Sequence, residues 1–222
     1  MMRRVLITGG SRGIGKAITQ CYLNAGHEVI LPGRDELDLA SETSVNEFIV
    51  ANQEKEFDVL INNAAENRIS PIKDLPTAAW QRMLMINLTA PFLLTKMVTP
   101  HMAQQGWGRI VNLSSCYSLV SRIGRAAYSS TKSGLNALTR TAALEYAENN
   151  VLVNAVCPGF VETDLTHQNN NPEQIQALCQ QIPLKRLGKP EEVADMVFYL
   201  GSDRNSYITG QIIIIDGGFL AQ

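Results

Sequence analysis

The stretch Arg4–Ile18, RVLITGGSRGIGKAI, decides the fold because it joins a short apolar run to a helical pattern through a glycine-rich turn. RVLIT reads as a strand buried on both faces, and residues 14–21 have helical spacing. Glycines at such a turn let the backbone approach a pyrophosphate, whose negative charge the amides of the next helix favour. The stretch therefore predicts a dinucleotide-binding turn with Gly9, Gly13 and Gly15 as contacts. The alternative is that these glycines only permit tight packing.

Five further apolar runs are bounded by Gly, Pro or Asn: HEVIL, DVLIN, GRIVNLS, VLVNAV and QIIIID. Longer segments with helical spacing separate most of them, for example residues 135–145. This alternation predicts βαβ units with right-handed crossovers, and hence a doubly wound parallel α/β sheet of the Rossmann type. No linker, repeat or low-complexity segment divides the chain, so we expect a single domain over residues 1–222.

One interval between the apolar runs is unusually short. From the second run, which ends near Pro32, to DELDLASETSV there is hardly space for a turn. If Asp35–Leu39 forms the third strand, the connection has no room for a crossover helix. We therefore expect the helix between strands two and three to be missing.

Composition bounds the class of protein. The formal net charge of −2 is spread along the chain and offers no general attraction for nucleic acid or an acidic membrane surface. The four cysteines form no Cys-x-x-Cys pair, so neither a zinc site nor a disulfide framework is indicated. No apolar run approaches the roughly 18 residues of a membrane span, and no apolar signal-peptide region precedes VLITG. We expect a cytoplasmic protein that binds a small molecule.

The end of the second apolar run bears on the choice of dinucleotide. An acidic residue about twenty positions past a glycine turn binds the adenosine ribose, whereas a basic residue there can hold a 2′-phosphate. Here Gly33 and Arg34 end the run, and Asp35 follows. Arg12 in the glycine turn adds a second positive charge, and guanidinium groups match phosphate geometry. We therefore expect NADP(H) to be preferred, with NAD(H) possible. The alternative is that Arg34 is only a solvated loop cation.

Tyr128 and Lys132 lie four positions apart in AAYSSTKSGL, residues 126–135, and share one face if this segment is helical. Free tyrosine titrates near pH 10, and a nearby ammonium would bring its pKa closer to neutrality, where acid and base catalysis works best. Ser115 follows the preceding strand, where its hydroxyl can hold a carbonyl oxygen. Because strand faces alternate, only one of Ser114 and Ser115 should point into a cleft. Taken alone, the tyrosine and lysine could equally be a packed ring beside an exposed ammonium.

Together these motifs resemble the short-chain dehydrogenase/reductase family, in particular its 3-oxoacyl-acyl-carrier-protein reductase-like group. The resemblance covers nearly the whole chain. It rests on TGGSRGIG at 8–15, NNAA at 62–65, MINLTAPF around Asn87, the thirteen-residue spacing from Ser115 to Tyr128, Tyr-x-x-x-Lys, PGFVET at 158–163 and GQIIIIDGG at 210–218.

The resemblance implies a hydride transfer between nicotinamide and a carbonyl or carbinol carbon. It assigns Tyr128 as the proton donor, Ser115 to the substrate oxygen, Lys132 to the ribose and Asn87 to a proton-relaying water. A backbone hydrogen bond that anchors its helix is the other reading of Asn87. The implied cofactor contacts are Gly9, Ser11, Arg12, Gly13, Ile14, Gly15, Arg34, Asp38, Leu39, Asn63, Ala64, Ala65, Tyr128, Lys132, Pro158, Gly159, Val161 and Thr163. For Asp38, near the adenine, helix capping is an equal alternative.

Two departures from the family pattern bear on the cofactor. Ala65 stands where the family has glycine, which removes backbone freedom and adds a methyl group near the cofactor. The short interval after the second strand leaves the position of Arg34 open. An NAD-linked alcohol dehydrogenase of the same fold is the main alternative function. A non-catalytic dinucleotide-binding protein is a further one, although no catalytic residue is replaced.

Residues from about 163 to 186 are polar and rich in amides, and we expect them to form a cover over the substrate. Their composition favours a polar or modest-sized carbonyl substrate over a long acyl chain. Arg122 and Arg125 lie close to Tyr128 in sequence and are candidates to meet an anionic group, with solvated loop charges as the alternative. The resemblance also implies a homo-oligomer, a tetramer or a dimer.

Overall fold

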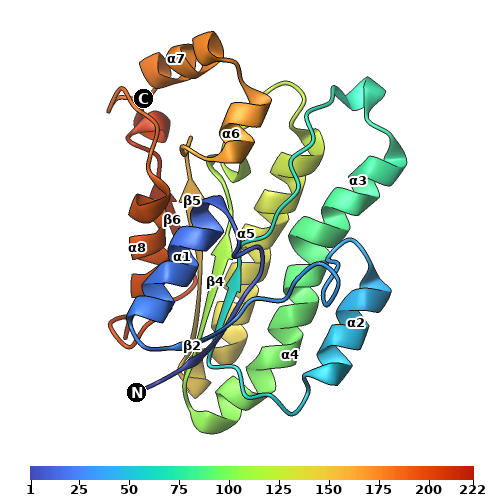
Figure 1. The fold of residues 1–222 in the computed structure, drawn as a ribbon, viewed down its shortest axis with the longest axis vertical. Helices are drawn as coiled ribbons and strands as arrows, with labels where there is room; N and C mark the ends of the chain where they lie inside the picture. Colours follow the sequence, from blue (N-terminus) through green and yellow to red (C-terminus); the bar gives the residue numbers. More distant parts are fainter.

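The chain folds around one parallel sheet, seen in the computed structural model (Figure 1). The structure describes the backbone of residues 1–222 and all side chains except those of Leu165 and Asn169, which fall within the predicted cover. The six strands have the order β2-β1-β3-β4-β5-β6. Their bounds are β1 Arg4–Ile7, β2 Glu28–Ile30, β3 Val59–Asn62, β4 Gly108–Leu113, β5 Val151–Pro158 and β6 Ile212–Ile215. All six predicted runs are strands, and the doubly wound parallel sheet is confirmed.

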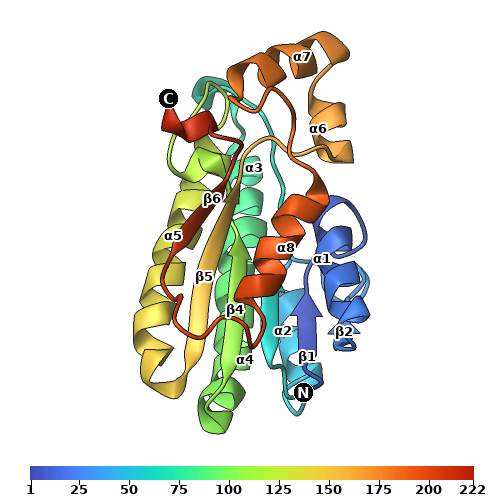
Figure 2. The same ribbon diagram turned by 90° about the vertical axis from the view of Figure 1, so that its left-hand side faces the viewer.

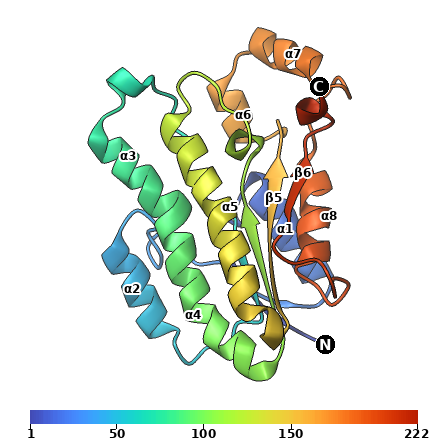
Figure 3. The ribbon, with the colours of Figure 1, turned by 180° about the vertical axis from the view of Figure 1, so that it is seen from behind.

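Helices cover both faces of the sheet because successive strand residues point to opposite sides. Leu6 and Leu60 face a core with α2, α4 and α5, whereas Val5 and Val59 face a core with α1 and α8. Figure 3 shows α2, α3, α4 and α5 side by side on one face, and Figure 2 shows α1 and α8 on the other. The bounds are α1 Gly13–Asn24, α2 Glu42–Ala51, α3 Thr77–Leu84, α4 Ala90–Gln105, α5 Ala126–Tyr146 and α8 Pro190–Leu200.

Residues 35–39 do not form the predicted third strand, and the prediction that no helix separates the second and third strands is also wrong. The short interval itself contains no helix: residues 33–40 form a turn that satisfies its own backbone groups. Leu37 N donates to the Gly33 carbonyl at 2.9 Å, and Glu36 Oε2 accepts from Gly33 N at 2.9 Å. Leu37 is buried in the core with α2, α4 and α5, and this contact fixes the position of the turn. The strand after β2 is β3, and α2 lies between the two with Ser41 as its N-cap.

Two helices lie beyond the carboxyl ends of the strands, α6 at Asp164–Asn169 and α7 at Pro172–Gln181. The strand arrows point to this end of the molecule, and both helices sit over it (Figures 1 and 2). Within the described residues, no helix combines the length and the apolar character needed to cross a membrane.

Candidate active site

A cavity of about 320 Å³ opens at the carboxyl ends of the strands. It collects segments from the glycine turn, the ends of β3, β4 and β5, the start of α5 and the cover. The predicted site residues that line it are Gly9, Arg12, Gly13, Ile14, Gly15, Asn63, Ala64, Ala65, Ser115, Tyr128, Lys132, Pro158, Gly159, Val161 and Thr163. Ser11, Arg34, Asp38, Leu39 and Asn87 are not among the described lining residues.

The glycine turn has the conformation that its sequence predicts. Gly9 and Gly13 have φ values of +65° and +50°, in the left-handed region that glycine adopts without strain. A Cβ on Gly15 would collide with the Gly9 carbonyl oxygen and lie 2.5 Å from Asn63 Nδ2. Among the described contacts, the side chain of Arg12 makes no capping bond to the first turn of α1. The amides of that turn therefore remain available to an anion.

Asn63 and Thr8 hold the turn against the end of β3. Asn63 Nδ2 donates to the carbonyls of Thr8 and Gly9 at 3.0 and 2.9 Å. Thr8 Oγ1 accepts from the backbone N–H groups of Asn63 and Ala64, both at 3.1 Å. Ala65 lies outside the left-handed region, since Asn150 and Lys185 are the described non-glycine residues found there. The alanine that replaces glycine in the family motif therefore costs no backbone strain.

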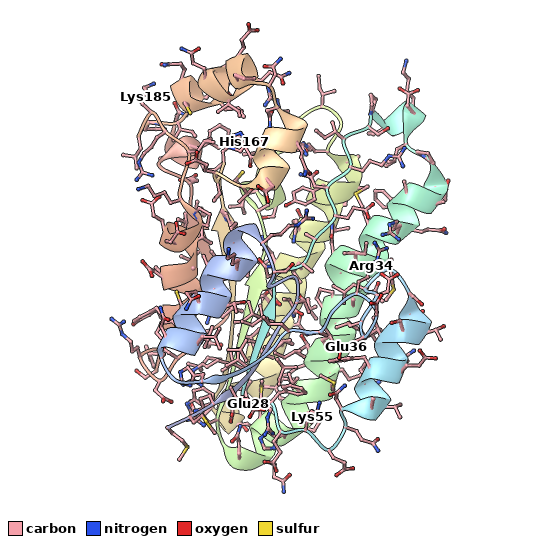
Figure 4. The ribbon with its side chains drawn as sticks, viewed as in Figure 1. Glu28, Arg34, Glu36, Lys55, His167 and Lys185 are labelled. Atoms are coloured by element: carbon pink, nitrogen blue, oxygen red, sulfur yellow. The ribbon has the colours of Figure 1, made fainter. Side chains whose placement is uncertain are left out.

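Arg34 lies on the exposed loop before α2, near Glu36 (Figure 4). Its Nε is 3.6 Å from Asp38 Oδ1, and the Arg34 side chain is 71% exposed. Asp38 Oδ1 also accepts from Ala40 N at 3.0 Å, a local turn bond. The carboxylate of Asp38 thus offsets part of the charge of Arg34, whereas Arg12 reaches the cavity wall itself.

Ser115, Tyr128 and Lys132 line the same cavity. Ser115 Oγ accepts from Tyr117 N at 3.2 Å, a bond that keeps the hydroxyl proton available. Ser114 Oγ donates instead to the Lys132 carbonyl at 3.3 Å. Lys132 is buried, and its Nζ donates to the Leu113 carbonyl at 2.6 Å. The adjacent serines therefore differ in their bonds, although both line the cavity.

We expect from the sequence that Lys132 brings the pKa of Tyr128 closer to neutrality, and this prediction is wrong for the protein by itself. Burial raises the pKa of Tyr128 to about 12, while hydrogen bonding to Ser115 and the charge of Arg125 act in the opposite direction. Lys132 Nζ is directed to a backbone carbonyl and lies 5.7 Å from the centroid of the Tyr128 ring. Burial lowers the pKa of Lys132 to about 8. Desolvation outweighs the attraction between the two groups, so Tyr128 stays neutral at physiological pH.

Asn87 lies outside the described cavity lining, in a π-helical turn, Met85–Thr89, between α3 and α4. Its Oδ1 accepts from Glu66 N and its Nδ2 donates to the Glu66 carbonyl, both at 2.8 Å. Nδ2 also donates to Thr131 Oγ1 at 3.1 Å. The side chain therefore ties the segment after β3 to α5, as the backbone-anchoring alternative predicts. Single π-helical turns of this kind are frequent at functional sites.

Several lining residues have no counterpart in the sequence prediction. Tyr117 and Phe160 form an edge-to-face pair at 6.1 Å, and Tyr117 packs against Tyr128 at 6.5 Å. Asn67 accepts from Arg125 Nη1 at 2.5 Å. The sequence carries no periodic signal for these residues, because they come from three separate loops. The remaining lining residues outside the predicted catalytic and cofactor set are Leu113, Ser114, Cys116, Asp164, Thr166 and Asn170. Arg122 and Arg125, the predicted candidates to meet an anionic group, also line the cavity.

A parallel doubly wound sheet with a glycine turn and a polar cavity at its carboxyl edge defines a dinucleotide-binding α/β protein. The family model described as enoyl-(acyl carrier protein) reductase matches residues 35–220. The chain belongs to the short-chain dehydrogenase/reductase family, and it is an NAD(P)-dependent oxidoreductase.

Among curated relatives, the 3-oxoacyl-acyl-carrier-protein reductase FabG of Aquifex aeolicus is 40% identical, with 96% of this chain and 95% of that protein covered. FabG of Thermotoga maritima is 37% identical, with 97% and 96% covered. Among solved structures, ElxO with NADP bound has a TM-score of 0.91 at 29% identity and covers both chains fully.

Proposed function

We propose that this oxidoreductase uses NADP(H) to reduce a carbonyl group to a secondary alcohol, with Tyr128 as the proton donor. The observation that carries the proposal is the convergence of Ser115, Tyr128 and Lys132 on a cavity that also meets the glycine turn. A 3-oxoacyl group, which the names of the FabG relatives contain, and a simpler oxo compound both offer the required carbonyl.

The residues of the glycine turn fit a dinucleotide. The left-handed Gly9 and Gly13 and the contact that excludes a Cβ at Gly15 let the backbone come close to a pyrophosphate. The first turn of α1 offers its amides to the negative charge. When bound, NADP(H) supplies the hydride that the reaction needs. We further propose that Pro158, Gly159, Val161 and Thr163, at and after the end of β5, hold the nicotinamide end.

Ser115, Tyr128, Lys132 and Asn87 divide the remaining work. Tyr128 gives its hydroxyl proton to the substrate oxygen, since a tyrosine is protonated at neutral pH and this one lines the cavity beside Ser115. Ser115 donates a hydrogen bond to the same oxygen and stabilises the charge that develops there. Lys132 holds the ribose and brings a positive charge beside the tyrosine. Asn87 anchors the segment after β3 at Glu66, and we assign to this segment the path by which solvent protons return to Tyr128.

The direction of the reaction separates this proposal from an NAD-linked alcohol dehydrogenase. The same tyrosine would give its proton in reduction and take it back in oxidation, so its chemistry is compatible with both directions. The reductase names of the relatives support the reductive reading.

The preference for NADPH is tested by replacing the two candidate arginines. We expect Arg12→Gln to weaken NADPH binding by about 10- to 100-fold, the loss of one charged hydrogen bond, and NADH binding by less than about threefold. Arg34→Gln should weaken NADPH binding less, because Asp38 already offsets its charge. Fluorescence titration of each protein with both cofactors measures this. Equal NADPH and NADH affinities, unchanged in both variants, would give precedence to the NAD-linked reading.

The lowered pKa of Lys132 predicts a pH profile. With the carbonyl substrate saturating, kcat/KM for NADPH reports the pKa values of the enzyme before the cofactor binds. Because Lys132 loses its proton near pH 8, kcat/KM should be constant below that pH and fall as pH rises through about 8. Tyr128, with its pKa at about 12, stays protonated over this range. Lys132→Arg keeps the positive charge and should remove the inflection. An inflection that persists unchanged in the variant assigns it to another group.

We also propose that the chain works as a single cytoplasmic domain, 1–222, with residues 163–186 as a substrate cover, and that copies of it associate as dimers or tetramers. Exposed apolar side chains on the surface support the association. Phe92 on α4, Leu144 on α5 and Ile214 on the edge strand β6 are 48%, 81% and 44% exposed.

A further inference from the structure

A second cavity of about 230 Å³ adjoins the first beneath α7. Arg122, Arg125 and Asn170 line both cavities and so form their shared wall. The far side of the second cavity consists of Ile69, Ile123 and one face of α7, where Gln174, Ala177, Leu178 and Gln181 recur at helical spacing. A substrate whose carbonyl lies at Tyr128 would therefore pass two guanidinium groups on its way to this second cavity.

Arg125 is held in place by two neighbours. Its Nη1 donates to Asn67 Oδ1, and its guanidinium carbon lies 5.1 Å from the centroid of the Tyr117 ring. Tyr117 in turn packs edge-to-face against Tyr128. Tyr117 is thus a neighbour of both the Arg125 guanidinium and the ring of the proposed proton donor. Because a guanidinium has five N–H donors, the one that Asn67 accepts leaves others for a ligand.

The charge of the first cavity is positive although the chain as a whole is negative. Its described lining carries the basic groups of Arg12, Arg122, Arg125 and Lys132 against the single carboxylate of Asp164. The formal net charge of the chain is −2. Arg12 and Lys132 belong to the proposed cofactor contacts, so the two arginines on the shared wall are left for the substrate. A concave site lined by one sign of charge concentrates ligands of the opposite sign.

We propose that the substrate is a short oxo acid whose carboxylate binds Arg125 and Arg122 while its carbonyl oxygen meets Ser115 and Tyr128. This inference rests on the proposed function and specifies its substrate class. Arg122 and Arg125 line the same cavity of about 320 Å³ as Ser115 and Tyr128, so one small oxo acid can meet both pairs of side chains. Reduction converts the oxo acid to the hydroxy acid: the carbonyl carbon takes the hydride that NADPH supplies, and its oxygen takes the proton of Tyr128. Guanidinium groups bind carboxylates through paired hydrogen bonds, and this gives the site its selectivity.

A matched pair of substrates tests the proposal: acetoacetate, which carries the carboxylate, and ethyl acetoacetate, whose ester stands in for an acyl thioester. The wild-type kcat/KM should be higher for the acid. In Arg125→Gln and Arg122→Gln the ratio of acid to ester should fall by about 10- to 100-fold, as expected for the loss of a hydrogen bond to a charged group. Arg204→Gln is the control, because Arg204 is exposed and adjoins Asn205, whose carbonyl binds Arg109 at the opposite end of the sheet.

Calorimetric titration with acetoacetate, with and without NADP⁺, gives a readout that does not depend on turnover, because NADP⁺ has no hydride to transfer. Binding in the wild type that is lost in Arg125→Gln and kept in Arg204→Gln supports the anion site. A wild-type enzyme that prefers the ester, a ratio unchanged in both variants, or no binding of acetoacetate overturns it. A protein that binds acetoacetate but neither binds nor oxidises NADPH would contradict the proposed function and leave the anion site standing.

Discussion

Replacing Tyr128 with phenylalanine is expected to lower kcat for carbonyl reduction by about 10²- to 10⁴-fold, the usual contribution of a positioned general acid. The variant removes one oxygen atom and keeps the ring that packs against Tyr117. The fold and the glycine turn should therefore be unaffected, and NADPH should bind as in the wild type. Steady-state oxidation of NADPH, followed by absorbance with ethyl acetoacetate or acetoacetate, measures the loss of kcat.

The control for this variant is Tyr207→Phe, which removes the same oxygen atom from a tyrosine that is 96% exposed. It should retain the wild-type kcat. If Tyr128→Phe turned over at the wild-type rate while saturated with NADPH, the proton would have to come from another group. The assignment of Tyr128 would then be wrong, even though NADPH still bound.

The second large effect is expected at Ser115. Ser115→Ala should lower kcat by about 10²- to 10³-fold, as the loss of one preorganised donor to a developing oxyanion does. The side chain is buried, and its hydroxyl is positioned by the Tyr117 N–H. Removing it takes a donor from the transition state and leaves Tyr128 in place. The same spectrophotometric assay measures kcat, with NADPH binding measured in parallel.

Ser114→Ala is the matched control for this prediction. Ser114 is the adjacent buried serine, but its Oγ donates to the Lys132 carbonyl at 3.3 Å. Removing the Ser114 hydroxyl should therefore lower kcat much less than removing the Ser115 hydroxyl. Similar losses in both variants would show that the assay responds to packing in this loop rather than to a hydrogen bond on the substrate.

Much of the fold could be predicted because every strand is a continuous apolar run between turn residues. Residues 35–39 form no strand, although LDL has the apolar alternation of one, because its neighbours favour a turn. Asp35, Glu36 and Asp38 can bond to nearby backbone groups, and the Glu36 side chain does so at Gly33 N. The burial of Leu37 completes the turn, and no local pattern indicates that contact.

The site was predictable where a motif has a fixed spacing and not where its effect depends on burial. The glycine turn, Ser115, Tyr128 and Lys132 line one cavity, as their spacing indicates. The direction of the pKa shift of Tyr128 was predicted wrongly, because the sequence shows the charge of Lys132 but not the desolvation of both groups. The pairing of Arg34 with Asp38 likewise depends on how a turn folds.

The central claim is that this chain moves a hydride from NADPH to a carbonyl carbon. The most direct test gives the wild-type enzyme NADPH deuterated at the transferred position of C4, together with acetoacetate and ethyl acetoacetate, and analyses the alcohol by mass spectrometry. We predict one deuterium on the carbinol carbon of the product, in step with the NADPH consumed. Tight NADPH binding with no deuterated alcohol from either compound would contradict the account.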